Sequence, residues 1–212
     1  MTRHQLGTLV VGSLLLAGCG KGAQPARESS GQAESAAAAA AADTSGGALQ
    51  LLDYVANVPR GWQSSPPKTS MRLAQFETTP VSGDTVGAQV VVYYFGPDQG
   101  GSVEANITRW ESQFRGPGGG PVQAKVERYD DTPFPTTVVT LQGAYARNVG
   151  MGADVAKAVP GQMLVAAIAA TPRGNIHFQI FGPAATVRAQ QKSFTAFVRS
   201  LSPKATPSGT AP

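Results

Sequence analysis

Residues 163–181 read MLVAAIAATPRGNIHFQIF, two apolar runs on either side of a turn. Met163 to Ala170 and Ile176 to Phe181 have the length and composition of β-strands. Between them, Thr171-Pro172-Arg173-Gly174-Asn175 contains the residues that favour turns. The pattern predicts a β-hairpin as the strongest local element of the chain.

Five further segments have strand patterns separated by turn residues. The run at 89–94 is almost continuously apolar, which predicts a central strand covered on both faces. Trp62 follows the turn Pro59-Arg60-Gly61 and is expected to plug one end of the core. The five segments are Leu51 to Val58, Met71 to Phe76, Ala88 to Phe95, Gln123 to Tyr129 and Thr136 to Tyr145.

Two helices are predicted from apolar residues at helical spacing. The first begins after the N-cap residue Ser102, ends at Gly116-Pro117 and turns Val103, Ile107, Trp110 and Phe114 toward the core. The second carries Val187, Phe194, Phe197, Val198 and Leu201. The fold class is therefore α+β, a mainly antiparallel sheet of about seven strands with two helices packed on it.

Charge excludes some functions. The chain has 17 Lys and Arg against 13 Asp and Glu, and the two signs alternate without forming a basic stripe. Nucleic-acid binding is not expected from such a pattern. With a single cysteine, the domain can form no internal disulfide.

Residues 1–18 have the layout of a signal peptide. Arg3 precedes an apolar run from Leu9 to Leu16, which is too short to span a bilayer. Leu16-Ala17-Gly18-Cys19 resembles the lipobox of bacterial lipoproteins. That resemblance implies cleavage before Cys19, a diacylglycerol on its thiol and an acyl chain such as palmitate on the new N-terminus. A plain secretory signal is the alternative.

The lipoprotein resemblance also predicts location. The residue after the cysteine is Gly20, and in this the sequence resembles lipoproteins that are sorted to the outer membrane of Gram-negative cells, where they face the periplasm. Residues 19–50 hold almost no large apolar side chain, which predicts a disordered spacer or neutral low-complexity sequence. A single globular domain is expected over 51–201 and a disordered tail over 202–212.

The expected function is a non-catalytic binding or scaffold domain held on the membrane, with an envelope protein as partner and no cofactor. Arg147 to Gln162 is the longest predicted loop, and Met151 and Val155 in it are the candidate contact residues. Both side chains are expected to be partly exposed beside a concave surface.

The alternative is an exported hydrolase whose site forms only in the fold, with His177 and one of Asp130, Asp131 or Asp154, or with a Ser or Thr nucleophile. Asp130-Asp131 before Thr132-Pro133 is typical turn sequence, so no metal site is predicted there. The glycines before Ser102 resemble a phosphate-binding loop, but the Lys-Ser/Thr pair is missing and a connector is favoured.

The element order and Val58-Pro59-Arg60-Gly61-Trp62 resemble the PsbP-like domains. That resemblance covers roughly Leu51 to Leu201 and implies an α/β/α sandwich, a fold that is mostly non-enzymatic and binds partners. It supplies no functional residue for this chain.

Overall fold

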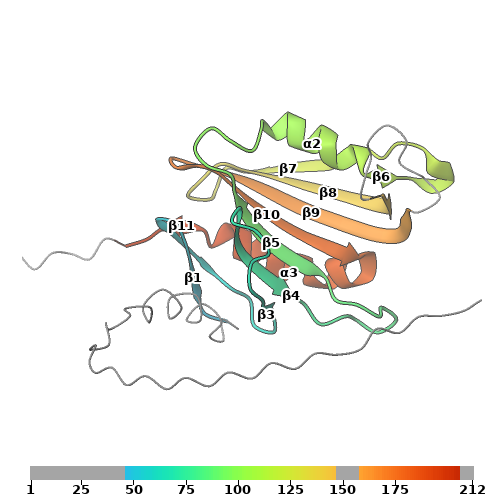
Figure 1. Cartoon of the computed structure of the whole chain (residues 1–212), viewed down its shortest axis with the longest axis horizontal. Helices are drawn as coiled ribbons and strands as arrows, with labels where there is room; N and C mark the ends of the chain where they lie inside the picture. Colours follow the sequence, from blue (N-terminus) through green and yellow to red (C-terminus); the bar gives the residue numbers. More distant parts are fainter. Residues whose placement is uncertain (1–45, 147–157, 206–212) are drawn as a thin grey trace, which may run out of the picture. The chain divides into compact units, whose positions relative to one another are not determined.

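The computed structural model describes residues 46–146 and 158–205, which belong to one compact unit. Its main feature is an eight-stranded antiparallel sheet (Figure 1). Seven of its strands form one continuous order of hydrogen-bonded neighbours. The eighth, β7 (Lys125–Tyr129), pairs with β8 (Thr136–Tyr145) outside that order. This order, the main path of the sheet, is β3 (Gln63–Ser64), β4 (Arg72–Glu77), β5 (Gln89–Tyr94), β10 (Gly174–Pro183), β9 (Val159–Thr171), β8, β6 (Phe114–Arg115).

The hairpin predicted from 163–181 is confirmed and lies at the centre of this sheet. Thr171 pairs with Gly174, so the turn is only two residues long. Gly174 has a φ of 105°, and a Cβ there would lie 3.1 Å from the Gly96 carbonyl oxygen, so glycine is required. The strands are longer than predicted. Strand β9 begins at Val159, which pairs with Tyr145, so its first residues belong to the segment predicted as a loop, Arg147 to Gln162.

A second sheet has the order β1 (Ala48–Leu51), β2 (Tyr54–Asn57), β11 (Ser202–Pro203). The single strand expected from Leu51 to Val58 is therefore wrong, because Leu52 takes a φ of 57° and turns the chain. Strand β11 uses the start of the segment predicted as a disordered tail. The domain therefore extends beyond its predicted limits, because β1 begins before Leu51 and β11 follows Leu201.

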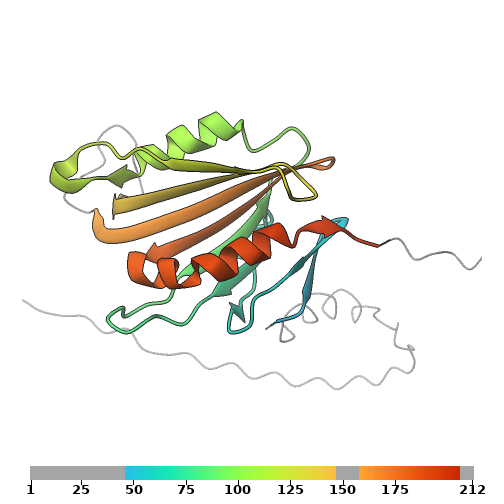
Figure 2. The same cartoon turned by 180° about the vertical axis from the view of Figure 1, so that it is seen from behind.

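The two helices cover opposite faces of the main sheet, because alternate side chains of β9 enter two different cores. Met163, Val165, Ala167 and Ala169 pack in the core with α3 (Ala184–Arg199), which Figure 2 shows across its face of the sheet. Leu164, Ala166 and Ile168 pack in the core with α2 (Val103–Ser112). The α+β class and the three-layer order are confirmed.

Helix α2 begins as predicted but ends early. Ser102 caps it by accepting a hydrogen bond from the Ala105 backbone N–H at 3.1 Å. The helix stops at Ser112, so Phe114 lies on β6, opposite Tyr145. Phe114 is still fully buried, since the strand pairing presents its ring to the same core. A short 3-10 turn, Pro117–Gly119, follows.

Helix α3 receives its N-terminal cap from a distant loop. Pro183 at the N-cap position offers no side-chain acceptor. Asp84 supplies it, because its carboxylate accepts hydrogen bonds from the Thr186 backbone N–H at 3.0 Å and the Thr186 hydroxyl at 2.6 Å. The loop between β4 and β5 is thereby fixed to the start of α3.

Trp62 plugs the α3 core, as predicted, with 1% of its surface exposed. Its ring packs edge-on against Phe197, and its Nε1 donates a hydrogen bond to Gln190 Oε1 at 3.0 Å. The buried ring therefore has its one polar atom satisfied.

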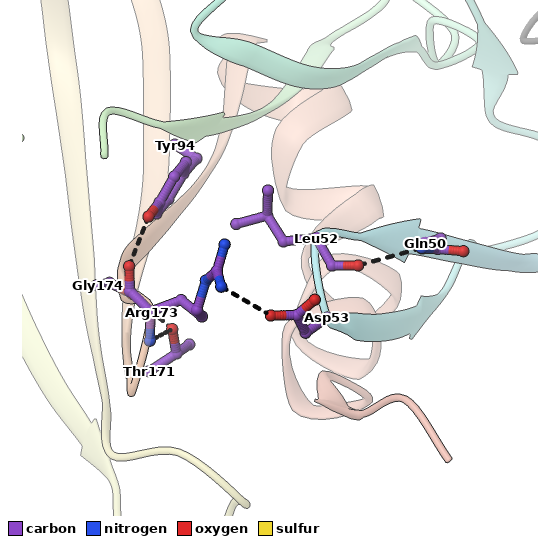
Figure 3. A network of polar contacts seen from close by, with 7 residues as sticks. All are labelled: Gln50, Leu52, Asp53, Tyr94, Thr171, Arg173 and Gly174. Atoms are coloured by element: carbon purple, nitrogen blue, oxygen red, sulfur yellow. Dashed lines mark hydrogen bonds and ion pairs between the residues drawn. The ribbon is translucent and has the colours of Figure 1, made fainter. Parts of the chain in front are cut away.

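The turns of the two sheets meet at Arg173 (Figure 3). Tyr94 Oη donates a hydrogen bond to the Arg173 carbonyl oxygen at 2.6 Å, and the Arg173 guanidinium lies 3.4 Å from the Asp53 carboxylate. Both charged groups are well exposed, so this contact orients the turns and contributes little stability.

Candidate ligand-binding groove

A groove of about 440 Å³ lies on the α2 side of the main sheet. This volume is within the range of small-molecule sites in proteins. Its walls come from α2 and from strands β4, β5, β8, β9 and β10. The lining residues are Arg72, Gln89, Val91, Tyr93, Arg109, Trp110, Gln113, Tyr145, Val159, Gln162, Leu164, Gln179 and Phe181.

Strand register places these side chains together. On β5, Gln89, Val91 and Tyr93 alternate with buried valines of the α3 core. Phe181 pairs with Gln89 and Gln179 pairs with Val91, so β10 continues the same face. The expectation that β5 is covered on both faces holds only in part, because Val91 is buried on this side while Gln89 and Tyr93 are partly exposed to the groove.

Arg72 is fixed at the β4 side of the groove by neutral groups. Its guanidinium donates a hydrogen bond to the Gln75 amide oxygen at 2.5 Å and lies 5.4 Å from the centre of the Tyr93 ring. Arg72 pairs with Tyr93 in the sheet register, which brings the two side chains together. The ring and the amide orient the cation without neutralising it.

Arg109 is held in the same way on α2. Its guanidinium donates to the Asn106 amide oxygen at 2.6 Å and lies 5.7 Å from the Trp110 ring. Asn106, which is 3% exposed, donates in turn to the carbonyl oxygens of Gly100 and Ser102 at 2.7 and 2.9 Å. The glycine-containing connector between β5 and α2, residues 95–102, is thus hydrogen-bonded to α2. This agrees with the prediction of a connector in place of a phosphate-binding loop.

The groove is electropositive. None of its described lining residues is acidic, and neither arginine forms an ion pair with a described residue. On the same strand face, Glu77 lies opposite Gln89 in register and accepts a hydrogen bond from the Gln89 amide at 3.0 Å. By contrast, Arg199 pairs with Asp131 at 2.8 Å.

His177 lies on the same sheet face but is buried beneath the connector. It is 1% exposed, and its ring packs edge-on against Phe95. Neither ring nitrogen has a hydrogen-bond partner among the described residues. Burial, with a smaller contribution from the nearby charge of Arg109, lowers the pKa of His177 to about 4. The imidazole is therefore neutral at physiological pH.

The structure does not bring the predicted hydrolase residues together. Asp131 pairs with Arg199, which lowers the pKa of that carboxyl. Asp130 precedes it in the connection between β7 and β8, and neither carboxylate forms a hydrogen bond with His177. Asp154 lies outside the described residues.

The other predicted site residues, Cys19, Met151 and Val155, also lie outside the described ranges. Sequence reasoning missed Arg72 and Arg109 because each is the one basic residue of its element, so no basic cluster marks either position. One available signal was that the same side of each strand carries polar and aromatic residues, Gln89 and Tyr93 on β5 and Gln179 and Phe181 on β10.

Within 46–146 and 158–205, no three His, Cys, Asp or Glu residues cluster as a metal site would require. No helix in those ranges is long and apolar enough to cross a membrane.

Comparison with protein-family models gives no match, and comparison with curated protein sequences gives none. Similar solved structures include PA94, a Pseudomonas aeruginosa protein of unknown function, at 16% identity over 75% of this chain and 97% of that chain, with a TM-score of 0.42. They also include cyanobacterial PsbP (CyanoP) from Synechocystis sp. PCC 6803, at 14% identity over 71% and 86%, with a TM-score of 0.44. A PsbP is thus among the structures that resemble this domain, and likenesses this distant carry no argument about its ligand.

Proposed function

We propose that this protein is a lipoprotein of the bacterial cell envelope whose α+β domain binds a ligand without transforming it. The groove carries the proposal, because it joins two arginines, four aromatic rings and several amide side chains in one concavity. Guanidinium, amide and aromatic groups bind and orient a ligand, and arginine does not exchange protons near neutral pH.

The position of the domain follows from the lipobox resemblance. Lipids on Cys19 would hold the chain on the membrane, and residues 20–45 would separate the described domain from the bilayer surface. The ligand is therefore to be sought in the envelope, and an envelope protein that presents it remains the proposed partner.

The anchor is tested by changing Cys19 to Ala in the full chain and separating membranes from soluble material. We expect the variant to lose the lipid and leave the membrane fraction, while a Ser13→Ala control in the predicted signal stays attached. A Cys19→Ala protein that is still cleaved after Gly18 and still membrane-bound would refute the anchor.

The groove is tested by placing a photo-crosslinking residue at Gln179, which lines it, or at Lys192, an exposed α3 residue. We expect a specific envelope component to be captured from Gln179 and not from Lys192. Identical products from both positions would show that the groove is not the binding site.

The loop residues Met151 and Val155 remain a separate proposal. The strands on either side end at Tyr145 and begin at Val159, and both of these residues line the groove. We expect a shortened loop to spare folding and weaken capture. A collapse of thermal stability would show instead that the segment belongs to the core.

A further inference from the structure

We infer that the ligand of the groove is a small organic acid, a single carboxylate carried on a flat and largely apolar body. This inference rests on the proposed function and names the class of ligand that the site takes.

The carboxylate is inferred from the way both arginines are held. Each guanidinium donates to one amide oxygen, Gln75 or Asn106, and lies beside one aromatic ring. A guanidinium has five N–H donors, so each retains donors for a ligand. Because the positioning partners are uncharged, the full positive charge remains for a carboxylate, which a guanidinium binds with two parallel hydrogen bonds.

The flat body is inferred from the rest of the lining. Tyr93, Tyr145 and Phe181 are partly exposed rings along the groove, and Val91 and Leu164 add aliphatic surface between them. Rings of this kind favour stacked or edge-on contact with another flat group. The amides of Gln113 and Gln179 can bind polar substituents.

Size and charge favour a small monoanion over a polymer. A volume of about 440 Å³ lies within the range of small-molecule sites in proteins. Glu77, beside Gln89 on the same strand face, would repel a ligand that carries several negative charges there.

The test measures binding of phenylacetate, phenylacetamide and acetate to the full chain. Trp110 lines the groove and Trp62 lies in the opposite core, so Trp62→Phe leaves a single tryptophan as a fluorescence reporter. Calorimetry on the unaltered chain checks the same affinities. We expect phenylacetate to bind at least about tenfold more tightly than the neutral amide or the acid without a ring.

Variants locate the effect. Arg72→Gln and Arg109→Gln should each weaken phenylacetate by about ten- to hundredfold and leave phenylacetamide unchanged. The affinity of Arg72→Lys for phenylacetate should lie between those of the unaltered chain and Arg72→Gln, since an ammonium keeps the charge but cannot form two parallel hydrogen bonds with a carboxylate. Arg188→Gln is the matched control, because Arg188 also donates to a glutamine amide oxygen, that of Gln142, but lies on α3. Thermal unfolding confirms that each variant is folded.

Equal affinity for phenylacetate and phenylacetamide, or unchanged affinity in both arginine variants, would overturn the inference. A peptide ending in a free phenylalanine carboxylate that binds tenfold more tightly than phenylacetate would overturn it in favour of a protein chain end. If no acid binds while Gln179 still captures its envelope component, only the ligand class is wrong. Loss of that capture as well refutes the proposed function itself.

Discussion

Lowering the pH should destabilise this domain through His177. The side chain is 1% exposed, and burial together with Arg109 lowers its pKa to about 4, against 6.5 for a solvated imidazole. Between these two values the unfolded chain binds a proton that the folded chain does not. The free energy of unfolding must therefore fall as the pH falls through this window.

The magnitude follows from the two pKa values. At pH 8 both states are neutral at His177 and the residue makes no difference to the pH dependence. At pH 5 the protonation of His177 in the unfolded chain lowers the free energy of unfolding by about 2 kcal/mol relative to pH 8, and the loss reaches about 3 kcal/mol at pH 4. This is a large share of the stability of an ordinary domain.

The measurement is urea unfolding of the full chain at pH 8, 7, 6 and 5, with His177→Gln as the non-titrating control. The chain has two histidines, and the other, His4, lies in the predicted signal. We expect the wild type to lose about 2 kcal/mol more than the variant between pH 8 and pH 5. Parallel losses in the two proteins would refute the reasoning and show that His177 titrates normally.

Three further predictions concern stability. Asp84→Ala removes the distant cap on Thr186 and should lower the free energy of unfolding by about 1 kcal/mol, measured by urea denaturation; an unchanged midpoint would contradict the capping role. Phe197→Ala empties the centre of the α3 core and should cost about 3–5 kcal/mol in the same assay, and a loss below 1 kcal/mol would mean that the core refills. Gly87→Ala should lower the melting temperature, because its Cβ would lie 1.7 Å from a backbone carbonyl oxygen, whereas Gly47→Ala meets nothing within 4 Å and is the control.

The spacing of apolar residues in the sequence predicted the helices that bury one face and the strands that are buried on both faces. The central hairpin and both helices follow from local apolar spacing, and the burial of Trp62 follows from its place directly after the turn Pro59-Arg60-Gly61. The ends of elements that are set by strand pairing between distant parts of the chain could not be predicted from this spacing. Phe114 continues the helical stripe in sequence, yet pairing with Tyr145 places it on a strand, and Ser202–Pro203 becomes a strand only because β2 lies beside it.

The groove could not be assembled from sequence because its charges come from elements far apart in the chain. Arg72 on β4 and Arg109 on α2 are neighbours of the same concavity only after β5 has been placed between β4 and β10. Asp84 shows the same limit, since nothing local to Thr186 indicates that a residue about a hundred positions earlier supplies its cap.

The existence of an open sheet face, however, follows from dimensions. Strands are spaced about 4.8 Å apart, so the seven strands on the main path form a sheet roughly 30 Å wide. A helix with its side chains is about 10–12 Å across and covers only two or three strands. On one face, α3 is joined by the second sheet in a common core. On the other, α2 has ten residues and packs over β8 and β9, which leaves β10, β5 and β4 without a covering helix. Val91 and His177 are still buried on that part of the face, but Gln89, Tyr93 and Gln179 are partly exposed there and line the groove. The imbalance between a wide sheet and one short helix therefore produces the groove, and the two arginines at its sides determine what it can bind.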